Sequence, residues 1–347
     1  MVFVLEGKPV RERPKRKPSE SVAELPTARL RYQNLDRPQP HWVHPMDRPR
    51  WSRVEAAAHM RDDDPVLGIV RGSEAWALPW WIMKNHHVAN LELGGEAIVV
   101  TFCEACSGAA AFRADVAGER RQFRLVGTYN GTILVADDQS RTLWAPFAGR
   151  GLVGPLEGTR LERLPMVQTD WKGWSRLQPH TRVLVADPKR RGGHGHGFGP
   201  GSEGLDEGFR STLAKPMDPR LSHNELVLGV DLDGTAKAYP LDRLGPVLND
   251  TVGGHEIVVL REPGSRLALA FHRRLGGEVL ELEVADDGAI VDRGSKSRWS
   301  YFGEATSGPH QGKRLPFAPS GLEEWYAWAA SFPDGTIHGD TPLPPAS

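Results

Sequence analysis

The sequence predicts a mainly β protein with short helices, an α+β fold in which two tandem repeats of one β-rich unit pack together. Three observations support this prediction. Glycine and proline account for 38 and 28 of the 347 residues, so the chain turns often and long helices are disfavoured. Short alternating or β-branched runs lie between these turns, as is typical of strands. The chain also resembles itself along most of its length, which indicates an internal duplication.

The duplication is clearest in the segments that open each unit. VLGIVRGSEAWALP (66–79) resembles VLGVDLDGTAKAYP (227–240), and VANLELGGEAIVV (88–100) resembles VLNDTVGGHEIVV (247–259). The offset between matching residues falls from 161 to 159 to 154, as expected where one copy has lost a few loop residues. Later single matches join Asp137, Trp144, Trp171 and Trp174 to Asp292, Trp299, Trp325 and Trp328.

Each unit is expected to be mostly strand and to close with one helix. In the first unit the expected strands are VLGIV (66–70), EAWALP (74–79), AIVVTF (97–102), RQFRLVG (121–127) and TILVAD (132–137). The dipeptide Asn130-Gly131 predicts a tight hairpin turn between the last two. The closing helices are expected in TDWKGWSRL (169–177) and GLEEWYAWAASF (321–332), where tryptophans three residues apart share a face and pack on the sheet.

The remaining segments complete the expected organisation. Residues 1–55 are predicted to be a proline-rich, basic, partly disordered N-terminal arm, and residues 339–347 a disordered tail. The first repeat is expected over residues 60–186 and the second, degenerate repeat over 223–338. Residues 187–222 are expected to be a Gly/His-rich linker or an active-site loop.

Composition excludes several classes of protein. The 43 basic and 44 acidic residues leave a net charge of -1, so neither nucleic acid nor a membrane surface is an expected partner. Two cysteines are too few for a disulfide scaffold. Neither a signal peptide nor an apolar run long enough to span a membrane is visible, so we expect the protein in the cytoplasm. The oligomeric state has no signal in the sequence.

The duplication separates residues that serve the fold from residues that serve one site. Side chains kept in both copies, such as Asp137 with Asp292, are expected to be structural. Cys103 and Cys106 are of the other kind, because LREPGSRLALAF (260–271) in the second copy has no cysteine. A Cys-x-x-Cys pair beyond a strand can bind a soft metal, can cycle between dithiol and disulfide, or can be two buried small side chains.

Histidines show the same asymmetry. Asn85-His86-His87 precedes the cysteines, and the second copy has Leu244-Gly245-Pro246 at that place. If the two histidines lie on a strand, their side chains face opposite ways, and only one can join the cysteines. His194 and His196, in Gly-His-Gly-His-Gly, can converge on one ion or can belong to a flexible linker. Thiolates with imidazoles suit copper(I) or zinc.

These residues resemble the bacterial and archaeal domain-of-unknown-function family 3179. Its signature includes A-Y-P, H-E-I-V-N-D, G-G, T-Y-C-P-L-C-x-x-A-x-A-F, D-R-x-T-x-S-x-W and a closing W-x-x-W. The sequence matches it at Ala77, Pro79, His86, Asn90, Gly94-Gly95, the Thr101–Cys106 stretch, Asp137, Trp144, Trp171 and Trp174. Glu104-Ala105 replaces the usual Pro-Leu, Asn85-His86-His87 replaces Trp-His-Glu, and His194 and His196 lie outside the pattern. The resemblance implies the repeated β-rich fold and a site at His86, Cys103 and Cys106, and it implies no established activity.

The leading functional hypothesis is a metal-binding protein, in one form a copper-dependent oxidoreductase, with zinc as the alternative metal. Cys103, Cys106 and His86 would be the ligands, and His87, His194 or His196 would complete or gate the site. The substrate would be a small molecule or a peptide. A thiol–disulfide redox protein that uses the two cysteines is the first alternative, and a non-catalytic binding or scaffold protein is the second. No separate catalytic residue is predicted.

Overall fold

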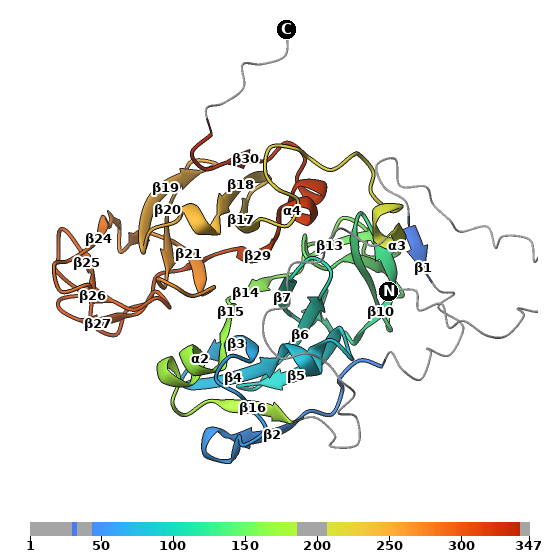
Figure 1. Cartoon of the computed structure of the whole chain (residues 1–347), viewed down its shortest axis with the longest axis horizontal. Helices are drawn as coiled ribbons and strands as arrows, with labels where there is room; N and C mark the ends of the chain where they lie inside the picture. The colour runs from blue at the N-terminus through green and yellow to red at the C-terminus, as the bar shows by residue number, and fades with distance from the viewer. Residues whose placement is uncertain (1–29, 33–43, 186–206, 341–347) are drawn as a thin grey trace, which may run out of the picture.

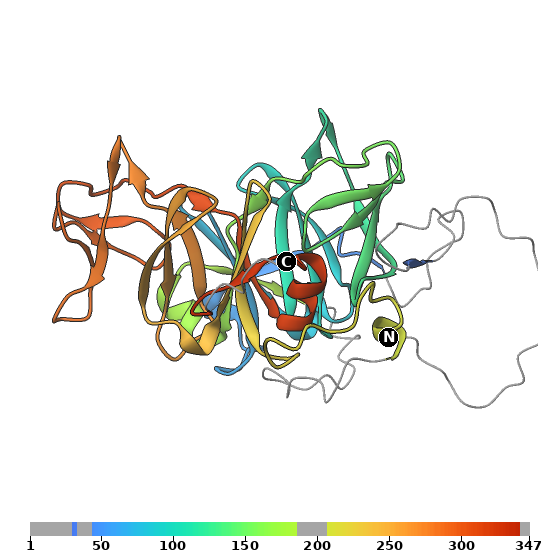
Figure 2. The same ribbon diagram turned by 90° about the horizontal axis from the view of Figure 1, so that it is seen from above.

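The structure, a computed structural model, describes residues 30–32, 44–185 and 207–340 (Figure 1). It is mainly β, as predicted, and its helices are short. Within the described residues no helix is long and apolar enough to cross a membrane. We call residues 65–185 the first half and residues 226–337 the second half; they lie side by side in Figure 2.

The first half contains three main sheets. The first has the strand order β15 (Val167–Asp170), β3 (Pro65–Arg71), β4 (Glu74–Pro79), β16 (Arg182–Val185) and β2 (Arg50–Arg53). The second has the order β14 (Arg163–Leu164), β7 (Gly108–Arg113), β6 (Glu96–Cys103) and β5 (Val88–Leu93). The third has the order β1 (Leu30–Tyr32), β10 (Phe123–Tyr129), β11 (Thr132–Asp137), β12 (Leu143–Ala145) and β13 (Arg150–Val153). A small hairpin joins β8 (Asp115–Val116) to β9 (Glu119–Arg120).

The second half also contains three main sheets and one small hairpin. The first has the order β29 (Ser320–Glu324), β17 (Leu226–Leu232), β18 (Thr235–Pro240) and β30 (Thr336–Ile337). The second has the order β28 (Phe317–Ala318), β21 (Ala268–His272), β20 (His255–Arg261) and β19 (Val247–Val252). The third has the order β24 (Leu282–Val284), β25 (Ile290–Asp292), β26 (Arg298–Trp299) and β27 (Ala305–Ser307), and the hairpin joins β22 (Arg274–Leu275) to β23 (Glu278–Val279).

The helices are brief connections between these strands. They are α1 (Trp80–Met83), α2 (Trp171–Leu177), α3 (Glu207–Arg210) and α4 (Trp325–Ser331), with 3₁₀ turns η1 (Val54–Ala56) and η3 (Leu241–Arg243). The closing helix expected over 321–332 begins only at Trp325. Residues 321–324 instead belong to β29, which pairs antiparallel with β17 along its whole length. The prediction was wrong there because the edge of β17 satisfies backbone groups that a longer helix would have satisfied internally.

Part of the N-terminal arm belongs to the sheets. β1 pairs with β10 at the edge of the third sheet, and β2 pairs with β16 at the edge of the first. In the segment expected to be a linker, α3 lies beside β10. The predicted turn at Asn130-Gly131 is confirmed: both residues have positive φ, 46° and 82°, and Tyr129 pairs directly with Thr132.

The closing helix of each half packs into the other half. Trp171 and Trp174 of α2 share a buried core with Leu267 and Leu269 of the second half. Tyr326 of α4 lies in the core formed by the second and third sheets of the first half, and Figure 2 shows α4 against that half. The two halves are therefore held together by exchanged apolar side chains.

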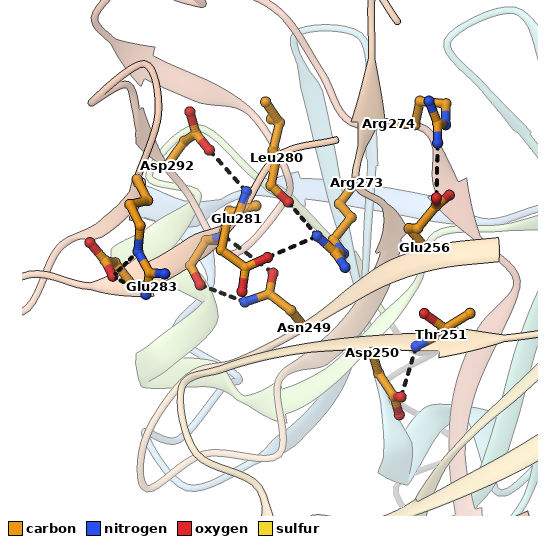
Figure 3. Close-up of polar contacts among 12 residues, drawn as sticks. Asn249, Asp250, Thr251, Glu256, Arg273, Arg274, Leu280, Glu281, Glu283 and Asp292 are labelled. Atoms are coloured by element: carbon orange, nitrogen blue, oxygen red, sulfur yellow. Dashed lines mark hydrogen bonds and ion pairs between the residues drawn. The ribbon is translucent and has the colours of Figure 1, made fainter. Parts of the chain in front are cut away.

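A half-buried asparagine ties the second sheet to the third in each half. In the second half the Asn249 amide donates to Leu282 O at 2.7 Å and accepts from Leu282 N at 3.2 Å (Figure 3). In the first half Asn90 makes the same exchange with Phe123, at 2.9 Å in both directions. Two paired hydrogen bonds inside the protein fix how these sheets meet.

Asp137 and Asp292 are both buried and accept several hydrogen bonds. Asp137 accepts from the Trp144 indole at 3.0 Å and from the Ser140 hydroxyl and amide, each at 2.6 Å. Asp292 accepts from the Ser295 amide at 2.6 Å. It also accepts from the Glu281 amide at 3.0 Å (Figure 3). Both contacts brace the loop after a strand, which is a structural role.

Candidate functional site

The Cys-x-x-Cys motif lies in the turn between two central strands of the first half. Cys103 ends β6, Gly108 begins β7, and these two residues pair across the hairpin. Both thiols are buried, at 1% and 0% exposure, and they form no disulfide. Gly108 is required beside them, because a Cβ there would lie 2.9 Å from Cys106 Sγ.

The pKa values of the two neighbouring thiols are shifted in opposite directions. A hydrogen bond from the Cys106 thiol lowers the pKa of Cys103, and backbone N–H groups of Ala105, Cys106 and Ile133 lower it further. Burial raises the pKa of Cys106 well above its ordinary value, and the charges of Cys103 and Glu323 add to the shift. Cys103 is therefore the sulfur that carries a negative charge first, with Cys106 as its proton-bearing partner.

The second half supplies a wall of this site. The Glu324 amide at the end of β29 donates to Cys106 O at 2.9 Å, and the Ser107 hydroxyl donates to Glu324 Oε1 at 3.1 Å. Gln168 Nε2 donates to both Ser107 O and Leu322 O, each at 3.0 Å. The motif is thus fastened to β29 by main-chain and side-chain hydrogen bonds.

Two adjacent carboxyl groups of β29 have unusual acidity. Burial raises the pKa of Glu323 to about 7, against the opposing charge of Arg163. Burial also raises the pKa of Glu324 to about 7, against the Ser107 hydrogen bond and the charge of Arg266. The Oε2 atoms of both have no hydrogen-bond partner among the described residues. Each can exchange a proton near neutral pH.

An open cleft of about 1420 Å³ lies between the halves, and none of residues 103–108 lines it. Phe147 lines it, and the same ring lies 3.2 Å from the Cβ position of Gly108, next to Cys106 Sγ. Phe147 is only 2% exposed. Its ring therefore separates the cleft from the Cys106 sulfur.

The histidines predicted for the site lie in a turn, so the assumption that they sit on a strand is wrong. His86 and His87 follow α1, and their amides both donate to Met83 O. His86 Nδ1 lies 2.8 Å from His44 O, and His87 Nδ1 lies 3.2 Å from Phe102 O. Carbonyl oxygens only accept, so each Nδ1 carries a proton. Burial lowers the pKa of His87.

Residues 44–185 and 207–340 contain no group of three His, Cys, Asp or Glu side chains placed to hold a metal ion. His194 and His196 lie outside the described residues. The turn that holds His86 and His87 is joined to the motif by Lys84, whose Nζ lies 2.6 Å from Glu104 Oε1.

Sequence reasoning missed the contribution of β29. Glu323 and Glu324 were included in a helix, and nothing local indicates that they pack beside residues more than two hundred positions earlier. A signal was available, since the self-comparison at offset 154 places Thr169 and Asp170 opposite them. Like the cysteines, this carboxyl pair has no counterpart in the segment that the self-comparison aligns with it.

Residues 43–336 match the family described as protein of unknown function (DUF3179). The chain belongs to this family. The match covers both halves and every described residue of the motif. No curated protein and no solved structure matches the chain. Membership confirms the resemblance drawn from the motifs.

Proposed function

We propose that the chain is two copies of one β-rich unit, of which only the first carries reactive chemistry. The strand orders support this. β15-β3-β4-β16 corresponds to β29-β17-β18-β30, and β14-β7-β6-β5 corresponds to β28-β21-β20-β19. β10 to β13 likewise correspond to β24 to β27. Two unrelated domains would not be expected to share this order in every main sheet.

We propose that the first unit carries out thiol–disulfide exchange at Cys103 and Cys106. The supporting observation is the hydrogen-bonded pair of buried sulfurs with opposite pKa shifts, next to a carboxyl group that titrates near pH 7. Exchange needs one thiolate that attacks, one thiol that resolves, and a proton acceptor for that thiol. Cys103, Cys106 and Glu323 fit these three roles.

The steps balance with an organic disulfide as oxidant. The Cys103 thiolate attacks one sulfur of the substrate, its S–S bond breaks, and a first thiolate leaves. Cys106 gives its proton to the Glu323 carboxylate, attacks the Cys103 sulfur of the mixed disulfide, and releases the second thiolate. The two released thiolates take up the proton held by Glu323 and the proton that Cys103 had lost to solvent. Overall, two protein thiols become one disulfide, and the substrate gains two electrons and two protons. A small-molecule or peptide disulfide fits this reaction, and two thiols without a disulfide fit a reducing cytoplasm.

The test is equilibration in glutathione buffers of graded potential, with the protein read out by alkylation and mass spectrometry. The wild type should lose two hydrogens in a single two-electron transition. Cys103→Ser and Cys106→Ser should show no internal disulfide, and Glu323→Gln should exchange more slowly at pH 7 than the exposed control Glu304→Gln. A wild type that stays reduced in fully oxidised glutathione, even after overnight equilibration, contradicts the proposal.

A soft-metal site is the second proposal, supported by two observations. The Cys103 sulfur already accepts backbone N–H groups, and both His86 and His87 direct Nδ1 to a carbonyl, which is how metal-binding imidazoles are oriented. Cys103, Cys106 and one of His86, His87, His194 or His196 would hold copper(I), or zinc as the alternative. Bound copper would supply one-electron redox chemistry there.

Elemental analysis distinguishes the two proposals. Protein purified under reducing, copper- or zinc-replete conditions should carry one metal ion per chain, and Cys103→Ser or His86→Ala should lose it. His338→Ala in the second half is the matched control and should keep it. Substoichiometric metal in the wild type contradicts the metal site and leaves the redox pair as the chemistry of the motif.

A further inference from the structure

Arg163 holds a guanidinium group at the edge of the cleft without a matching carboxylate. Its Nη1 donates to Phe147 O at 2.8 Å, and the group lies 5.7 Å from the centre of the Phe112 ring. No carboxylate of the described residues lies within ion-pair distance of it. Glu323 and Asp231 are the acids whose charge reaches it, and Asp231 is already paired with Arg160 at 2.7 Å. Several guanidinium donors therefore remain available to the cleft.

The chain makes room for this group. Arg163 lies over Gly321, where a Cβ would be only 2.2 Å from Arg163 Nη2. Gly321 pairs with Gly229 within the β17–β29 ladder. The missing side chain on β29 is what lets the guanidinium lie between the halves.

The corresponding place in the other half shows what the fold alone requires. Phe317 pairs with Phe271 on β21 as Arg163 pairs with Phe112 on β7. Val167 stands opposite Gly68 as Gly321 stands opposite Gly229.

At that end of the interface, Phe317 and Val167 belong to one apolar core. Apolar side chains at these two positions are therefore sufficient to join the halves. Arg163 over Gly321 replaces this apolar contact by a half-buried charge, which costs stability unless a partner compensates for it.

We propose that the cleft binds an organic carboxylate with an aromatic or apolar body, anchored by the Arg163 guanidinium. An arginine fork pairs with a carboxylate through two parallel hydrogen bonds. Two half-buried rings that line the same cleft, Phe302 and Phe317, supply apolar surface for the rest of the ligand. Phe112, Phe147 and Phe271 also line the cleft but are only 2 to 3% exposed. This ligand site goes beyond the proposed chemistry of the cysteines, and it does not depend on whether they bind metal or form a disulfide.

The same carboxylate chemistry occurs in small aromatic acids and at peptide C-termini. N-acetylphenylalanine represents the first source, and the peptide N-acetyl-Ala-Ala-Phe represents the second. The amide of N-acetylphenylalanine has the same body without the charge, and inorganic phosphate has an anion without the body. Calorimetric titration of the full chain with these four probes separates charge from apolar burial.

The acid is expected to bind at least about tenfold more tightly than its amide, because a bidentate charged pair contributes roughly 1.4 kcal/mol or more. Arg163→Gln should weaken the acid to the level of the amide. Gly321→Ala, whose Cβ displaces the guanidinium, should do the same while keeping the charge. Arg314→Gln is the matched control: it lines the same cleft, but its guanidinium is paired with Glu304 at 2.8 Å.

Equal affinity for acid and amide overturns the proposal, as does tighter binding of inorganic phosphate or no binding of either carboxylate probe. Unchanged acid binding by Gly321→Ala also overturns it, and this variant decides the matter if Arg163→Gln fails to fold. A peptide that binds more tightly than N-acetylphenylalanine assigns the cleft to peptide C-termini, and the reverse assigns it to small aromatic acids. Whether Cys103 and Cys106 form a disulfide or bind metal in the same preparations does not change the interpretation of these binding measurements.

Discussion

The loop after β6 and the loop after β20 occupy the same place in two sheets of equal strand order, yet they differ in chemistry. The first holds two buried thiols against carboxyl groups from the other half. The second holds Glu262, whose carboxylate pairs with the largely exposed Arg176 of α2. Because an ion pair between a buried glutamate and a largely exposed arginine completes the second loop, the fold does not require sulfur at this position. The thiols, Glu323 and Arg163 are thus departures from what folding needs, and they gather on one side of the interface.

The largest expected effect is on stability, at a glycine that packs under a tryptophan in each half, where the two halves should lose similar stability. A Cβ at Gly68 would lie 2.2 Å from the Trp174 ring, and one at Gly229 would lie 2.1 Å from the Trp328 ring. Gly68→Ala and Gly229→Ala should each lower the free energy of unfolding by about 4 kcal/mol, because neither indole can retreat from its packed core. Urea unfolding measures both. A difference of more than about 2 kcal/mol between them would contradict equivalence of the halves.

The second prediction compares the loss of stability when each of the buried aspartates, Asp137 and Asp292, is replaced by alanine. Asp137→Ala should destabilise by about 3 kcal/mol, because it leaves the buried Trp144 indole without its acceptor and removes one of the two carboxylates that pair with the buried guanidinium of Arg121, the other being Glu119. Asp292→Ala should cost about 2 kcal/mol, because Asp292 mainly accepts backbone amides and the Trp299 indole has no partner among the described residues. Thermal and urea unfolding of the two variants check the order. Equal losses would mean that the extra partners of Asp137 contribute nothing.

A third prediction concerns the pH dependence of stability that arises from Glu323 on β29. The folded pKa of Glu323, about 7, is above its ordinary value of 4.5, so the folded state holds the proton more tightly than the unfolded state. The stability from this group is present below pH 4.5 and is lost as the pH rises to about 7, a change of about 3 kcal/mol.

Glu323→Gln should therefore gain on the wild type as the pH rises from 4.5 to 8, in urea unfolding at each pH. Glu304→Gln, which alters an exposed pair, should follow the wild type throughout. A Glu323→Gln difference that is independent of pH would show that this carboxyl group ionises normally.

The smallest expected effect is on access to the sulfur. Phe147→Ala removes the ring between the cleft and Cys106 and should raise the rate of thiol alkylation about tenfold, if the ring accounts for about 1.4 kcal/mol of the opening cost. Phe302 lines the same cleft away from the cysteines, so Phe302→Ala should leave the alkylation rate unchanged. Equal rates in both variants would place the route to the thiols elsewhere.

Much of the fold could be predicted from local pattern. The strands of the first half, the turn at Asn130-Gly131 and the helix at Trp171 follow from alternation, turn chemistry and tryptophan spacing, which act over a few residues. The start of α4 could not, because β17 pairs with residues 321–324 and overrides their helical pattern. The motif around Cys103 was visible as an asymmetry between copies. Its neighbours were not, because Glu323 and Arg163 reach it only when the two halves pack together.

The hydrogen bond between Ser107 and Glu324 joins residues that are 217 positions apart. At about 5–20 residues per second, a ribosome needs roughly 10 to 40 s to make the segment between them. During that interval the nascent chain has its cysteines but not the strand and helix that cover them. Until β29 and α4 have been synthesised, Cys103 and Cys106 are accessible to oxidants, thiols or metal ions in the cell. In the folded protein both thiols are buried.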